Sequence, residues 1–156
     1  MVLMSLAMMR LRNLPKAGFS GVETMCNISG LPENHTRYLA GTATEFERSG
    51  TMNTYLLVDP SERQIFGYFS IGPGIRCAIG DPVFEVARLF GIDEDIEYTL
   101  VTYAMDIVRA FNDNVCHAEI SARCRKEQFG LFSNRGFTYK GNVPGGFIRM
   151  QYREFR

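Results

Sequence analysis

The chain has 156 residues, 46% of them hydrophobic, which suits one domain of ordinary size with a core of its own. Lys plus Arg and Asp plus Glu both number 17, so the overall charge gives no indication of a nucleic acid or an anionic membrane as partner. Residues 1–9 are apolar, but the basic residues follow them and the run is too short to span a bilayer, which predicts a cytoplasmic protein.

The first third of the chain predicts one strand followed by helices. A strand is expected within residues 1–14, with 8–14 its best part. Residues 15–34 contain repeated Gly and Pro, which favours irregular structure or a broken helix. Residues 35–48 are expected to be helical, ending before Gly50.

The middle of the chain changes to a strand pattern. The β-rich runs 53–59 and 64–71 flank the short turn 60–63 and predict a hairpin. The Gly- and Pro-rich run 72–82 is expected to be a loop, and 83–92 a further strand.

The second half predicts a strand–helix–strand unit and a last hairpin. The helix is expected over 97–111, because apolar residues recur there at helical spacing, namely Leu100, Ala104, Ile107, Val108 and Phe111. A strand at 115–122 and a short helix that closes on Gly136 follow. Residues 137–141 and 146–154 then form the hairpin.

This order of elements predicts an α+β fold. Antiparallel neighbours combine with one crossover in the second half, so we expect a central mixed, mostly antiparallel sheet flanked by helices. Because no repeat, low-complexity run or long linker divides the chain, residues 1–156 are expected to form a single domain.

The four cysteines predict reduced thiols rather than a metal site. No pair has CxxC spacing, and Cys116 and His117 would point to opposite faces of a strand. We therefore expect no bound metal.

Three stretches carry a resemblance to a known family. They are Ile120-Ser121-Ala122 followed by "LFSNRGF" (131–137), the paired runs "NTYLLVDPSERQIFGYFSIG" (53–72), and "VARLFGID" (86–93). Together with the order of elements over residues 36–152, they resemble the GNAT superfamily of acyl-CoA-dependent N-acyltransferases. The resemblance implies a GNAT-like domain in which a bulge splays the neighbouring strands 83–92 and 115–122.

The resemblance also implies an activity. An acetyl group would pass from acetyl-CoA, as co-substrate, to the amine of a small molecule or peptide by direct attack in the V-shaped gap. The residues expected to bind acetyl-CoA lie along one strand end, the helix start and the far wall: Leu89, Phe90, Gly91, Thr99, Thr102, Ser121, Ala122 and Phe132. Glu85 and Glu119 are candidate bases, and solvated or ion-paired carboxylates are the alternative for both. His35 and His117 lack a Ser or Cys partner at a recognisable spacing, so neither is given a catalytic role.

Two features depart from the family pattern. The family has a Gly-rich "RGxGxG/A" loop before its main helix, where backbone N–H groups hold the CoA diphosphate, but this chain has an acidic run at 93–99. Phe132 stands where many members have a proton-donating Tyr. Two alternatives therefore stay open: a non-catalytic GNAT-fold binding or scaffold module that has lost CoA, and an independently arisen fold that binds another ligand in the gap. The sequence leaves subunit number open, a homodimer included.

Overall fold

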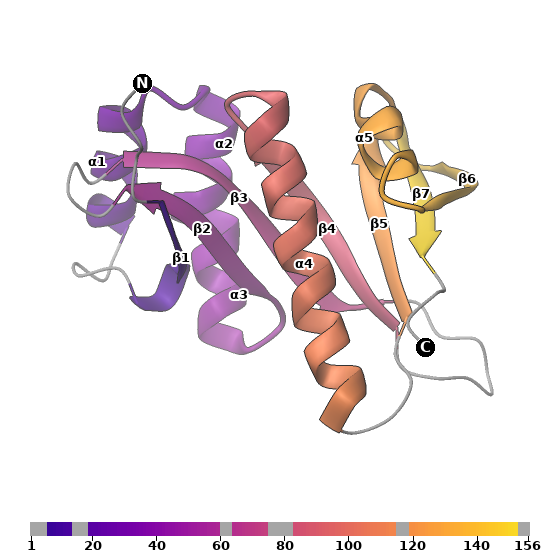
Figure 1. Ribbon diagram of the computed structural model, residues 1–156. Coiled ribbons are helices and arrows are strands. Elements are labelled where there is room, and N and C mark those ends of the chain that lie inside the picture. Colours follow the sequence, from indigo (N-terminus) through magenta and orange to yellow (C-terminus); the bar gives the residue numbers. More distant parts are fainter. Residues whose placement is uncertain (1–5, 14–18, 60–63, 75–82, 115–118, 153–156) are drawn as a thin grey trace.

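The structure is a computed structural model that describes residues 6–13, 19–59, 64–74, 83–114 and 119–152. Its centre is a seven-stranded sheet of order β1-β2-β3-β4-β5-β7-β6. Strands β4 and β5 are parallel, and every other neighbouring pair is antiparallel. This arrangement confirms the predicted α+β architecture with a mixed, mostly antiparallel sheet (Figure 1).

The elements follow the predicted order along the chain. The strands are β1 (Ala7–Arg10), β2 (Asn53–Asp59), β3 (Gln64–Pro73), β4 (Val83–Gly91), β5 (Glu119–Arg125), β6 (Thr138–Val143) and β7 (Phe147–Tyr152). The helices are α1 (Phe19–Ser29), α2 (Glu33–Arg37), the π-helical η2 (Tyr38–Ala43), α3 (Thr44–Ser49), α4 (Glu94–Asn114) and α5 (Phe129–Ser133), with the 3₁₀ turns η1 (Leu11–Asn13) and η3 (Lys126–Gln128). Within these described ranges, no helix combines the length and the apolar character that a membrane crossing needs.

Some predicted boundaries were wrong. Strand β5 continues to Arg125, beyond the predicted range 115–122, because its pairing with β7 continues to Arg125 opposite Phe147. Helix α4 begins at Glu94, before the predicted range 97–111, since acidic residues suit the positive end of a helix. The turn predicted at 60–63, most of the loop predicted at 72–82 and the first residues of the strand predicted at 115–122 lie outside the described residues.

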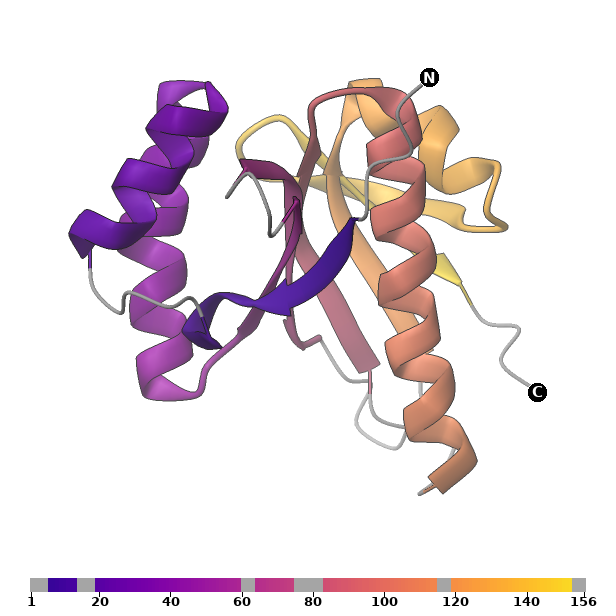
Figure 2. The same cartoon turned by 60° about the vertical axis from the view of Figure 1, so that its left-hand side comes forward.

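Helices cover both faces of the sheet. Figure 2 shows α4 on one face and the helices of the N-terminal part on the other. Successive side chains of a strand point to opposite faces, so Leu56 and Tyr68 join the core under α1–α3, whereas Leu57 and Phe69 join the core under α4. Strand β3 is buried along nearly its whole length without alternation, because neither of its faces meets water.

Two glycines bring the start of α4 against the sheet. Gly67 of β3 and Gly91 of β4 lie opposite each other in the antiparallel register. A Cβ on Gly67 would lie 2.9 Å from the side chains of Ile96 and Leu100, and one on Gly91 would lie 2.8 Å from the backbone nitrogen of Glu97. The missing side chains therefore let the first turn of α4 contact the strands directly.

Strands β4 and β5 pair at one end only. Their parallel register joins Val83–Val86 to Glu119–Ala122, and both strands continue beyond it without pairing. Figure 1 shows the two strands meeting at one end and diverging toward the other. The predicted splayed pair is thus confirmed.

A bulge in β4 coincides with the point where the two strands separate. Ile71 of β3 is opposite Val86 and Ser70 is opposite Arg88, so Ala87 has no partner on β3. An extra residue changes which face each following side chain meets. Val86 and Leu89 accordingly both enter the core under α4, although they are three positions apart.

Candidate functional site

A cavity of about 520 Å³ lies where β4 and β5 diverge. One wall comes from the helical segment α2–α3 and includes His35, Tyr38 and Phe46. The other wall comes from residues 87–89 of β4 and 123–125 of β5, with Gln128 and Phe147 beside them. The unpaired part of both strands therefore borders an open space.

A buried polar network lines the wall nearest to α2. The Arg88 Nε donates to the Tyr68 hydroxyl at 2.8 Å, and this hydroxyl lies 2.7 Å from His35 Nδ1. The hydroxyl can donate to His35 Nδ1 while it accepts from Arg88, an arrangement in which the imidazole proton lies on Nε2. The Arg88 guanidinium also stacks 4.2 Å from the centre of the Tyr38 ring. The network thus holds Arg88 in one position at the cavity.

Burial keeps His35 neutral. Its side chain is stacked on Phe90 with ring centres 3.8 Å apart, and the residue is only 6% exposed. Desolvation, reinforced by the positive charges of Arg88 and Arg125, lowers the pKa of His35 to about 4. At neutral pH the imidazole is therefore a fixed hydrogen-bonding group rather than a cation.

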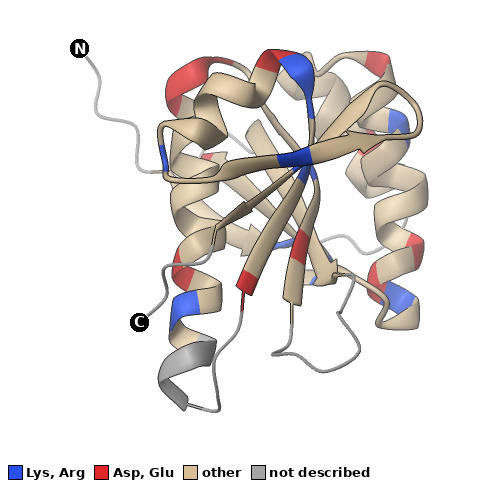
Figure 3. Ribbon diagram, turned by 90° about the vertical axis from the view of Figure 1, so that its right-hand side faces the viewer, with Lys and Arg blue, Asp and Glu red and all other residues tan. Residues whose placement is uncertain are grey.

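The cavity is cationic. Three arginines line it, namely Arg88, Arg123 and Arg125, and none of the described residues that line it is acidic. Arg123 stacks 4.3 Å from the centre of the Phe147 ring, and its Nε is buried without a hydrogen-bond partner among the described residues. Figure 3 shows basic positions gathered where β5 and β7 cross the middle of the sheet, with acidic positions toward the end where β4 and β5 meet.

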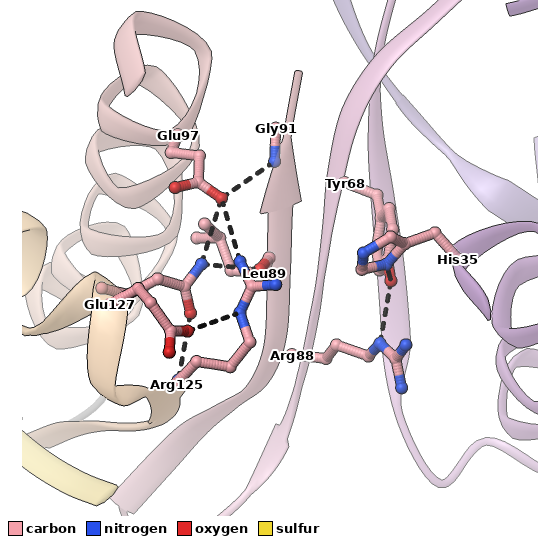
Figure 4. A network of polar contacts seen from close by, with 9 residues as sticks. His35, Tyr68, Arg88, Leu89, Gly91, Glu97, Arg125 and Glu127 are labelled. Atoms are coloured by element: carbon pink, nitrogen blue, oxygen red, sulfur yellow. Dashed lines mark hydrogen bonds and ion pairs between the residues drawn. The ribbon is translucent and has the colours of Figure 1, made fainter. Parts of the chain in front are cut away.

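Two side chains bridge the gap on its other side. Gln128 donates from Nε2 to the Leu89 carbonyl oxygen at 2.9 Å and to the Glu97 Oε2 at 3.1 Å. The same Oε2 accepts from the Gly91 N–H at 3.1 Å and lies 3.8 Å from an Arg125 nitrogen. Figure 4 shows this cluster on one side of β4 and the His35 network on the other. Main-chain groups of β4 that face the gap are thus bonded by the protein's own side chains.

The start of α4 is also internally satisfied. Asp93 accepts from the Ile96 N–H at 2.8 Å through its carboxylate and from the Glu97 N–H at 3.1 Å through its carbonyl. These bonds occupy the backbone N–H groups with which the start of a helix would otherwise bind an anion. Thr99 and Thr102, predicted to bind acetyl-CoA, donate instead to carbonyl oxygens one turn earlier in α4. Thr102 also accepts a hydrogen bond from Arg135.

The predicted strand residues divide between the open and the closed part of the gap. Leu89, Phe90 and Gly91 lie on β4 beyond its pairing with β5. Ser121 and Ala122 lie in the paired part, opposite Glu85 and Val86. The strand was predicted to end at Ala122, but β5 continues to Arg125, so Ser121 and Ala122 lie within the strand.

The two candidate bases lie at the paired end. Glu85 accepts from Arg149 at 3.0 Å, and Glu119 accepts from Gln151 at 2.6 Å. Neither is among the residues that line the cavity. Their catalytic assignment stays a prediction.

Phe132 and Cys124 belong to the core under α4. Phe132 is 1% exposed and packs edge-on against Phe137, with ring centres 5.2 Å apart. Burial raises the pKa of the Cys124 thiol to about 12, so this thiol stays protonated at neutral pH. Cys26 is likewise a free, buried thiol.

Sequence reasoning missed the polar groups of the cavity. His35 was set aside because no Ser or Cys lies at a recognisable spacing, yet its partner is Tyr68, a residue of a different element. The overall charge is balanced, and no long run of positive charge in the sequence marks the three arginines of the cavity, Arg88, Arg123 and Arg125. The one available signal was the alternation of Arg123 and Arg125 along a strand, which places both on one face.

The chain resembles solved structures of toxins. No protein-family model and no curated protein matches its sequence. A complex of AtaT with acetyl-methionyl-tRNAfMet has 16% identity and a TM-score of 0.70, covering 96% of this chain and 95% of that one. AtaTR bound with acetyl-CoA has 18% identity and a TM-score of 0.68, covering 96% and 95%. A mutant of KacT has 13% identity and a TM-score of 0.68, covering 96% of both chains. At these identities the likeness concerns the fold, and the fold of this chain is the GNAT-like α+β fold that it shares with AtaT and KacT.

Proposed function

We propose that this protein is an N-acyltransferase that moves an acetyl group from acetyl-CoA to an amine in the gap between β4 and β5. The observation that carries the proposal is the bulge at Ala87, after which β4 leaves β5, residues 87–89 line a cavity, and the Leu89 carbonyl and the Gly91 N–H have no strand partner on the side of the gap. The acetyl-CoA complex of AtaTR, which has the same fold, supports the choice of donor.

The gap fits one part of acetyl-CoA and not the other. An acyl-pantetheine arm is extended and carries amides, so it can pair with the free edge of a strand. The diphosphate, in contrast, needs unpaired N–H groups and no negative charge, whereas the first turn of α4 carries Glu94, Asp95 and Glu97. The course of β4 therefore fits the arm, although Gln128 and Glu97 bond the Leu89 carbonyl and the Gly91 N–H in the arrangement shown, and the start of α4 does not fit the diphosphate. The wider binding set, with Phe90, Thr99, Thr102, Ser121, Ala122 and Phe132, stays a proposal.

The main chain supplies the expected electrostatic support. Acetyl-CoA, when bound, supplies a thioester whose carbonyl carbon is open to an amine. The Leu89 N–H points to the same side of β4 as its carbonyl, which faces the gap, so it is placed to donate to an oxygen on which negative charge develops. An α-amine with a pKa near 8 is partly neutral at physiological pH, so attack does not require a strong base. Glu85 and Glu119 remain the proposed bases where one is needed.

The cationic wall indicates an anionic acceptor. Arg88 and Arg123 have no carboxylate partner among the described residues, and the buried Nε of Arg123 has no hydrogen-bond partner there. Aromatic rings of Tyr38 and Phe147 lie beside these two guanidinium groups. Phosphates bind arginine, and bases stack on such rings. Since AtaT has been solved with acetyl-methionyl-tRNAfMet, we propose the α-amine of an aminoacyl-tRNA as the acceptor.

The test measures release of free thiol from acetyl-CoA. We expect release with a charged tRNA, and a much weaker response with the corresponding free amino-acid amide. The double variant Arg88→Ala, Arg123→Ala should raise the KM for charged tRNA and reduce its salt dependence, because fewer phosphates are neutralised. The matched control is Arg109→Ala, which removes an exposed arginine of α4 that is paired with Asp106. Equal loss in both variants would show that overall charge, and not the cavity, attracts the acceptor.

A second candidate is a non-catalytic module that keeps the fold as a scaffold. The bonds of Glu97 and Gln128 to main-chain groups of β4 favour it, because they close the gap without a ligand. Absence of thiol release with every amine, together with no thermal stabilisation by millimolar acetyl-CoA, would select this reading.

A further inference from the structure

The carboxylate of Glu97 is held in an anion site made by the protein itself. Its side chain is 14% exposed and comes from the first turn of α4. One oxygen, Oε2, accepts from the Gly91 N–H and from the Gln128 amide, both at 3.1 Å, with Arg125 at 3.8 Å. A main-chain N–H, an amide and a guanidinium therefore converge on one negatively charged atom.

Gln128 connects this carboxylate to both strands. Its Nε2 donates to the Leu89 carbonyl of β4, and its Oε1 accepts from the Arg125 N–H at the end of β5, at 3.2 Å. The side chain is buried, so its two functional ends are fixed by these partners. Glu97 and Gln128 together replace the pairing that β4 and β5 lack beyond Ala122.

We infer that the Glu97–Gln128 bridge is a latch that competes with the acyl donor for β4. The inference rests on the proposed function. The latch bonds the Leu89 carbonyl and the Gly91 N–H, which are the groups that an acyl-pantetheine arm would pair with in the gap. Donor binding then requires Glu97 and Gln128 to turn away, and this movement also frees Arg125 from its carboxylate partner on α4.

With a latch, the apparent Kd of the donor equals its Kd for the open protein divided by the fraction of protein in which the latch is open. One charge-assisted hydrogen bond given up on opening corresponds to about a tenfold change in that fraction. Simple repulsion between Glu97 and the phosphates of CoA would also weaken binding, but it would not affect a donor that has no phosphates. The two explanations therefore differ in what they predict for acetyl-pantetheine, the thioester arm alone.

The experiment measures the Kd of acetyl-CoA and of acetyl-pantetheine by calorimetric titration. The variants are Glu97→Ala, which removes the carboxylate, and Gln128→Ala, which removes the bonds to Leu89 and Glu97. The matched control is Glu94→Ala, which removes an exposed charge from the same turn of α4. The backbone amide resonance of Gly91 provides a second readout, because its bond to Glu97 must break when the donor binds.

We expect Glu97→Ala to bind both thioesters about tenfold more tightly than the unaltered protein, and Gln128→Ala to change affinity in the same direction. Glu94→Ala should leave the affinity for acetyl-pantetheine unchanged. The latch is refuted if Glu97→Ala affects acetyl-pantetheine no more than Glu94→Ala does, or if it weakens binding of both thioesters while the variant stays folded. In either case acetyl-CoA still binds and the proposed function stands. Binding of neither thioester to any of these proteins would instead overturn the proposed function itself.

Discussion

Acidification is expected to destabilise the protein through His35. The pKa of His35 is lowered from 6.5 to about 4 in the folded protein, first by desolvation and then by the charges of Arg88 and Arg125. At pH values between the folded and the unfolded pKa, the unfolded chain binds more protons than the folded one. The stability that comes from a neutral His35 is therefore complete above the unfolded pKa and is lost as the pH falls from there toward the folded pKa. At 1.36 kcal/mol per pKa unit, a change from about pH 7.5 to about pH 5 removes about 2 kcal/mol from the free energy of unfolding.

Urea denaturation of the unaltered protein and of His35→Gln at both pH values isolates this contribution. Glutamine does not titrate and retains a side-chain acceptor for the Tyr68 hydroxyl, so contributions from groups other than His35 cancel when the pH dependences of the two proteins are compared. Only the difference between the two pH dependences is compared, so a general loss of stability in the variant does not matter. We expect the unaltered protein to lose about 2 kcal/mol more than the variant. Equal losses would mean that His35 is protonated in the folded state near pH 5, which would refute the neutral, buried network.

Four further predictions concern residues around the gap. Phe132→Ala should lower the free energy of unfolding by about 3–5 kcal/mol, because it leaves a cavity at a 1% exposed position; a loss below about 1 kcal/mol in urea denaturation would contradict that placement. Gly91→Ala should cost about 1–3 kcal/mol, since its Cβ would lie 2.8 Å from the Glu97 backbone. Gly130→Ala, in α5 with nothing within 4 Å of the added atom, should instead stabilise by about 0.5–1 kcal/mol in the same assay. Cys124 should react with iodoacetamide at neutral pH only after unfolding, as mass spectrometry of its peptide would show, because its buried thiol is protonated.

The elements were predictable because each has a local signal. The β-rich run of β3 and the apolar stripe of α4 depend on neighbours in the sequence, so pattern reasoning found both. The parallel pairing of β4 with β5 followed from the crossover helix and from the resemblance. The end of β5 was misplaced because its partner β7 decides how far the ladder extends, and pairing is not a local property.

The site depended on information that a linear pattern does not hold. The bulge at Ala87 has no sequence signal, because neither Gly nor Pro marks it, although it decides where the strands separate. The acidic run at 93–99 was visible, but the sequence did not show that Glu97, rather than Glu94 or Asp95, contacts β4. That choice depends on Gly91, which lets the first turn of α4 approach the strand.

The bulge also places the residue proposed to attract the acceptor and the residue proposed to oppose the donor on different sides of β4. Past Ala87, Arg88 faces the Tyr38 side of the sheet, whereas Leu89 enters the core under α4 and offers its carbonyl to Gln128. A guanidinium on one face can attract an anionic acceptor while a carboxylate on α4 opposes the donor, because the strand lies between them. Substitution of Arg88 should therefore change acceptor use without changing donor affinity, and substitution of Glu97 should do the reverse. If the two substitutions altered both quantities together, the two clusters would be one coupled site, and the assignment of one face of β4 to each substrate would have to be abandoned.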